Sequence, residues 1–161
     1  MGYLFLLVPN VEMISATVFI AAAFVGPLYG ILIGGCAELI FSLFNPMGAA
    51  APPLLVAQVF SFMLFGLVGG LVGLPKTKPL WRTMILCGVC GFFLTLVYDV
   101  LTTLSFSIFM AGDNLEKIIT IFSTGILFYV IHSLVNTMIF TTIVPAILYG
   151  IQRYSVFQNN V

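Results

Sequence analysis

Long hydrophobic runs separated by short polar breaks make up nearly the whole chain. They cover residues 11–25, 28–44, 54–74, 83–110 and 118–149. A helix needs about 20 mainly apolar residues to cross the hydrocarbon core of a bilayer. The pattern therefore predicts an all-α integral membrane protein, a compact bundle of five transmembrane helices that forms a single domain over residues 1–161.

The breaks between the runs contain residues that end and restart helices. Gly26-Pro27 leaves almost no room between the first two runs, so we expect a tight helical hairpin there. Residues 45–53 form a loop rich in Pro, Gly and Ala, and residues 75–82 and 111–117 are polar turns. From Gln152 onward the chain is polar, and we interpret this stretch as a tail.

Composition indicates that lipid is the solvent for most of the surface. The chain is 61% hydrophobic and 6% charged, with a mean hydropathy of +1.23. Water-soluble domains carry about 25% charged residues. The five basic and five acidic residues also form no charged block. Nucleic acid is therefore excluded as a partner, because phosphate binding needs clustered Lys or Arg.

Basic residues near the ends of the runs predict the orientation in the membrane. Lys76, Lys78 and Arg82 share one loop, and Arg153 follows the last run on the same side. Only Lys117 lies on the opposite side. Cytoplasmic loops carry the excess of Lys and Arg, so we expect the 76–82 loop and the C-terminus to be cytoplasmic.

Small residues cluster in the third run, at Gly66, Gly69, Gly70 and Gly73. This spacing lets two helix backbones approach closely in a membrane. We favour packing within the protein over a docking surface for another membrane protein. Cys87 and Cys90 are likewise interpreted as small packing residues rather than a redox or metal site.

Three runs carry ionisable residues, which are costly inside a membrane and therefore suggest a functional site. They are Glu38, Asp99 and His132. Polar residues at helical spacing extend each face: Ser42 and Asn45, then Thr95, Thr102 and Thr103, then Ser133, Asn136 and Thr137.

Depth along the runs favours a pocket over a pore. At about 1.5 Å per residue, Glu38 lies roughly 9 Å and Asp99 roughly 14 Å from the outer ends of their helices. A pore or a proton wire needs polar residues along its whole length, whereas the cytoplasmic halves here are almost entirely apolar. We expect a ligand pocket that faces outward; the alternative is a buried network in which these side chains only satisfy one another.

The chain lacks the local motifs of common hydrolases and nucleotide-binding proteins. It has no GxSxG, no HExxH and no glycine-rich phosphate loop. Glu38, Asp99 and His132 lie on three different helices without metal-ligand spacing. We predict no enzymatic activity, no metal and no cofactor, and any energy from ATP has to come from another chain.

Several segments together resemble one branch of the substrate-binding S components of energy-coupling factor transporters. The similar segments are Pro9-Asn10-Val11-Glu12-Met13-Ile14-Ser15, Gly26-Pro27, Ala37-Glu38-Leu39, Phe44-Asn45-Pro46-Met47-Gly48, Pro52-Pro53 to Ala57-Gln58, and Tyr98-Asp99-Val100-Leu101-Thr102. The resemblance runs from about residue 9 to about residue 150 and is carried by the order and spacing of these segments.

The resemblance implies a six-helix protein of a prokaryotic plasma membrane with both termini cytoplasmic, so most of helix 1 would be missing here. Such a protein captures a vitamin or related micronutrient near the outer face. It then passes the molecule on with a membrane coupling protein and two ATPase subunits. Cobalamin, riboflavin and a queuosine precursor all remain open as substrates.

The substrate-binding residues that we expect are Glu12, Glu38, Asn45, Gln58, Tyr98, Asp99, Thr102, His132 and Asn136, with the 45–53 loop as a lid. Two other functions remain open. One is an intramembrane enzyme that uses His132, Asp99 and Glu38. The other is a membrane scaffold that transports nothing.

Overall fold

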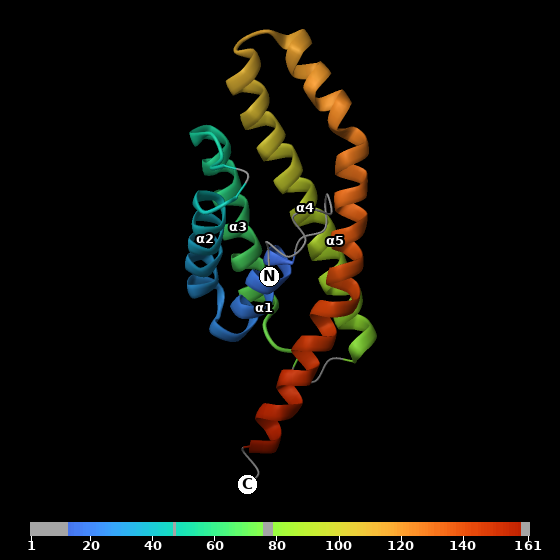
Figure 1. Cartoon of the computed structure of the whole chain (residues 1–161). Helices are drawn as coiled ribbons and strands as arrows, with labels where there is room; N and C mark the ends of the chain where they lie inside the picture. The colour runs from blue at the N-terminus through green and yellow to red at the C-terminus, as the bar shows by residue number, and fades with distance from the viewer. Residues whose placement is uncertain (1–12, 47, 76–78, 159–161) are drawn as a thin grey trace.

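A computed structural model describes residues 13–46, 48–75 and 79–158, with side chains as far as Gln152, and this part of the chain is helical with short connections. The helices are α1 (Ile14–Val25), α2 (Pro27–Leu43), α3 (Pro52–Val72), α4 (Leu80–Ala111) and α5 (Leu115–Gln158). Figure 1 shows two helix pairs, α2 with α3 and α4 with α5, with α1 between them near one end. The all-α prediction is confirmed for the described residues.

Three of the described helices, α3, α4 and α5, are long and apolar enough to cross a membrane. α1 has 12 residues and α2 has 17. At 1.5 Å per residue α1 is about 18 Å long, well short of the ~30 Å hydrocarbon core. The first predicted span is thus a short apolar helix, joined to α2 by the expected turn at Gly26.

Glycine and proline set most helix boundaries. Gly26 has a φ of 92°, which residues with a Cβ rarely adopt, and Pro27 then starts α2 with its φ already fixed. α3 starts at Pro52, two residues before the predicted span. The predicted tail from Gln152 is wrong as far as Gln158, where α5 ends. Residues 152–158 contain no Gly or Pro that would stop the helix.

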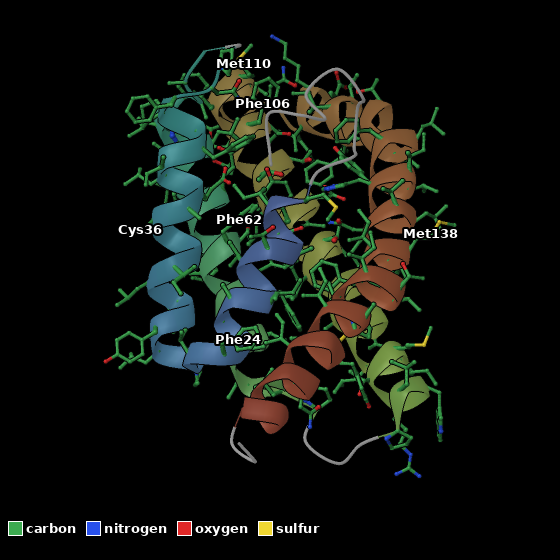
Figure 2. The ribbon with its side chains drawn as sticks, turned by 60° about the horizontal axis from the view of Figure 1, so that its bottom comes forward. Phe24, Cys36, Phe62, Phe106, Met110 and Met138 are labelled. Carbon is green, nitrogen blue, oxygen red and sulfur yellow. The ribbon has the colours of Figure 1, made fainter. Side chains whose placement is uncertain are left out.

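The side chains are distributed as lipid solvation requires. Leu28 is 69% exposed and Leu127 is 72% exposed, whereas Glu38 is only 2% exposed. Figure 2 places Cys36 and Met138 on opposite flanks of the molecule and Phe62 between the helices. A water-soluble protein shows the reverse tendency, since its charged side chains stay in water.

Glycines allow α2 and α3 to touch backbone to backbone. A Cβ on Gly30 would overlap the carbonyl oxygen of Gly66, and a Cβ on Gly66 would overlap the carbonyl oxygen of Gly30. Gly69 lies in the same way against the backbone of Phe19 in α1, and Gly70 against that of Pro27. The packing interpretation is confirmed for these α3 glycines, while Gly73 ends the helix with a φ of 61°.

Aromatic rings fill the space where α1, α3 and α5 meet. Phe140 of α5 lies 5.1 Å from Phe19 of α1 and 5.8 Å from Phe65 of α3, measured between ring centroids. Phe62 continues the cluster beside Phe65 at 5.7 Å. Edge-on and tilted contacts of this kind are favourable for aromatic pairs, so this cluster holds the two helix pairs and α1 together.

Adding one methyl group at the α2–α3 contact should separate the two helices. We expect Gly66→Ala to lower the free energy of unfolding by about 1–3 kcal/mol, because the new Cβ meets backbone that cannot rotate away. Gly150→Ala is the control, since among the described residues no atom beyond its own helix backbone lies within 4 Å of its new Cβ. Thermal unfolding in detergent measures both, and equal melting temperatures for the two variants would contradict the close contact.

Candidate functional site

Every fourth residue of α4 is buried along most of its length. This row consists of Thr83, Cys87, Gly91, Thr95, Asp99, Thr103 and Ser107. α5 carries a matching buried row of His132, Asn136, Phe140, Val144 and Leu148. Side chains four residues apart form ridges on a helix surface, and here the two ridges face each other.

Hydrogen bonds connect the α4 row to side chains of α5. Thr103 Oγ1 donates to the Tyr129 hydroxyl at 2.8 Å. His132 Nδ1 lies 2.7 Å from Asp99 Oδ1, and Asn136 Nδ2 donates to Thr95 Oγ1 at 2.9 Å. The bonds are spaced by about one helical turn on both helices, and the chains run in opposite directions. We call these six residues the polar ladder.

The central rung is an acidic and a basic side chain buried together. Asp99 is 3% exposed and His132 is 6% exposed. An ionised carboxylate can only accept hydrogen bonds, so in that state His132 donates through Nδ1–H. Nε2 is then the nitrogen with which His132 can act on a second molecule. A pair removed from water in this way interacts more strongly than a surface pair.

A second polar chain reaches the ladder from α2 and α3. Ser42 Oγ donates to Gln58 Oε1, and Gln58 Nε2 donates to the Tyr98 hydroxyl, each at 3.4 Å. The Tyr98 ring meets the His132 ring edge-on, with 5.9 Å between the centroids. Polar groups from α2, α3, α4 and α5 therefore converge on the Asp99–His132 pair.

Two buried oxygens of the ladder are left over. Among the described residues, neither Asp99 Oδ2 nor Asn136 Oδ1 has a hydrogen-bond partner. Asn136 is only 1% exposed. The two side chains belong to neighbouring rungs, one helical turn or about 6 Å apart along the axis. Both atoms are acceptors, so the site offers more acceptors than donors.

The predicted polar residues end up in several places. Asp99, His132, Asn136, Tyr98 and Gln58 come together as described. Glu38 is buried on α2, one turn before Ser42. Tyr98 and Asp99 lie in the half of α4 that leads to α5, and Glu38 lies in the half of α2 that leads to α3.

Three further predicted residues lie outside both the polar ladder and the hydrogen-bond chain through Gln58. Glu12 lies outside the described residues. The prediction that Asn45 extends the Glu38 face is wrong, because α2 ends at Leu43 and Asn45 lies in the following loop. Thr102 remains half-buried on α4, where its hydroxyl donates to the Tyr98 carbonyl oxygen of its own helix at 2.7 Å.

Sequence reasoning did not identify Tyr129 as part of the site. Its hydroxyl accepts the hydrogen bond from Thr103 and extends the ladder toward the α4–α5 turn. Counting outward from residue 113 places position 127 opposite Asp99 and position 123 opposite Thr103, five to six residues short of His132 and Tyr129. Distance along the sequence from the turn therefore gives no signal for this pairing.

No family model, curated protein or solved structure matches this chain. Within the described residues, no three His, Cys, Asp or Glu side chains gather as metal ligands. The arrangement can hold a small polar molecule by hydrogen bonds, and its His–Asp pair can accept or donate a proton.

Truncation of the two members of the central pair should have unequal effects. We expect His132→Ala to cost about 3–5 kcal/mol in the free energy of unfolding, because it leaves a carboxylate buried without its partner. Asp99→Ala leaves a neutral imidazole and should cost about 1–3 kcal/mol. Denaturant unfolding in detergent measures the difference.

The control for this comparison is Thr142→Val. Thr142 is exposed on α5 and its hydroxyl donates only to the Met138 carbonyl oxygen of its own helix. Its unfolding free energy should stay close to that of the unaltered chain. A smaller loss for His132→Ala than for Asp99→Ala would show that the buried carboxylate is not held by the histidine.

Proposed function

We propose that the chain is the substrate-binding S component of an energy-coupling factor transporter. In this proposal it captures a vitamin or related micronutrient from the outer side of a prokaryotic plasma membrane. A membrane coupling protein and two ATPase subunits complete the transport step. The sequence resemblance suggests the family, and the buried polar site supports the binding role.

The observation that carries the proposal is the convergence of polar side chains from four helices on the Asp99–His132 pair, inside a molecule whose outer surface is apolar. Small-molecule sites are enclosed, mostly apolar and equipped with a few fixed polar groups. Here the aromatic rings of Tyr98 and Phe128 lie beside His132, at 5.9 and 6.2 Å between centroids. These groups can hold the ring system and the polar groups of a micronutrient.

The position of the polar site supports an outward-facing pocket. Glu38 and Ser42 lie in the half of α2 that leads to α3, and Asp99 and Thr103 lie in the half of α4 that leads to α5. Figure 1 shows these two connections at the same end of the molecule. Arg82 lies at the other end, at the start of α4. Since basic residues favour the cytoplasmic side, the polar half faces outward in the proposed orientation.

One observation favours a second candidate, an intramembrane enzyme. The 2.7 Å contact between Asp99 and His132 is the arrangement that orients a histidine as a general base. This candidate predicts turnover of a substrate by the purified chain alone, and loss of that turnover in His132→Gln. The S-component proposal predicts binding without turnover.

Native mass spectrometry of the protein purified in mild detergent tests the binding role. We expect a small molecule to co-purify with the unaltered chain and to be lost from Asp99→Ala, because the ligand and His132 both depend on that carboxylate. Thr142→Val should retain it. If the protein carries no small molecule and binds none after incubation with a panel of vitamins, the scaffold function is favoured instead.

Orientation can be tested with cysteine labelling in intact cells. A membrane-impermeant maleimide should label Asp113→Cys at the exposed α4–α5 turn from the outside. Arg82→Cys should be labelled only after the cells are permeabilised. The unaltered chain gives the background from Cys36, Cys87 and Cys90, all of which lie within helices. The reverse labelling pattern would invert the proposed topology.

A further inference from the structure

The charges of the chain limit what the polar site can bind. Its basic residues other than His132 are Lys76, Lys78, Arg82, Lys117 and Arg153. Arg82, Lys117 and Arg153 lie toward helix ends, and Lys76 and Lys78 lie outside the described residues. The buried polar half contains the acidic residues Glu38 and Asp99 but no Lys or Arg. A carboxylate or phosphate would meet negative charge there, and only His132 could oppose it.

The two acceptor oxygens without a partner further limit the class of ligand that can bind. Asp99 Oδ2 and Asn136 Oδ1 are buried, and a buried polar atom without a hydrogen-bond partner is unfavourable, more so when it is charged. Buried polar groups in folded proteins almost always have a partner. An acceptor oxygen needs an N–H or O–H donor, and the carboxylate favours a donor that carries positive charge.

We propose that the polar ladder binds an organic ligand through N–H groups, one directed at Asp99 Oδ2 and one at Asn136 Oδ1. The ligand is a planar nitrogenous cation or a neutral amide- or amidine-like heterocycle, and not an acid. This inference rests on the proposed binding function and adds the chemical class of the substrate.

The surroundings favour an organic ligand over a bare metal ion. Ca²⁺ and Mg²⁺ bind about six or more oxygen atoms, whereas the ladder has only two oxygens to spare. The rings of Tyr98 and Phe128 lie 5.9 and 6.2 Å from the ring of His132, measured between centroids, and Phe62 lies 5.9 Å from Tyr98. Aromatic faces attract organic cations.

Benzamidine and benzoate form a matched pair of probes. They have the same ring and nearly the same shape, but benzamidinium presents N–H donors and a positive charge, while benzoate presents two acceptors and a negative charge. Isothermal titration of the full chain in a non-ionic detergent, with protein-free micelles subtracted, compares them. We expect benzamidinium to bind at least about tenfold more tightly than benzoate.

Two variants test whether the ladder causes this preference. Asp99→Asn keeps the shape of the side chain but removes its charge and replaces one acceptor with a donor, so the preference should fall by about tenfold or more. Thr142→Val, outside the ladder, should keep the preference. Size-exclusion chromatography confirms that each variant is folded.

Three results would overturn the inference: no binding of benzamidinium, equal binding of benzoate, or a preference that persists in folded Asp99→Asn. The identity of the co-purifying molecule separates this inference from the proposed function. A retained carboxylate or phosphate compound would refute the ligand class but leave the binding role intact. If no small molecule of any kind is retained or bound, the binding role itself fails.

Discussion

The contact between Asp99 and His132 sets the register of the α4–α5 pair, on which the rest of the site depends. A carboxylate buried at 3% exposure is tolerated in a membrane only when a partner reaches it. His132 reaches it only in the observed register of the two helices. The same alignment brings Asn136 to Thr95 and Tyr129 to Thr103. A slip of one residue would break all three contacts together.

The two helix pairs are held by different means, because lipid provides no hydrophobic drive for helices to associate. α2 and α3 are joined by backbone contact at Gly30 and Gly66, where dispersion forces act over a short distance. α4 and α5 are joined in their polar half by hydrogen bonds, and in the other half by Phe140 packing over Gly91. The apolar packing therefore does not depend on the polar half, so a ligand can bind there without disrupting it.

Periodicity alone predicted the helical class, the Gly26 turn and the polar faces that contain Asp99 and His132. It did not predict which residues pair, because a face is a property of one helix and a hydrogen bond requires the register of two. It also overextended the Glu38 face to Asn45: α2 stops at Leu43 although Asn45 is correctly spaced. The short length of α1 and the helical continuation to Gln158 depend on local ending signals, which hydrophobicity does not report.

A buried ionic pair is weak evidence for stability, since well-packed hydrophobic residues of similar size often do as well or better. Asp99 Oδ2 and Asn136 Oδ1 contribute still less, because they carry the cost of burial without a hydrogen bond from the described residues. A bound molecule, as proposed above, would supply the hydrogen-bond donors that these two acceptors lack.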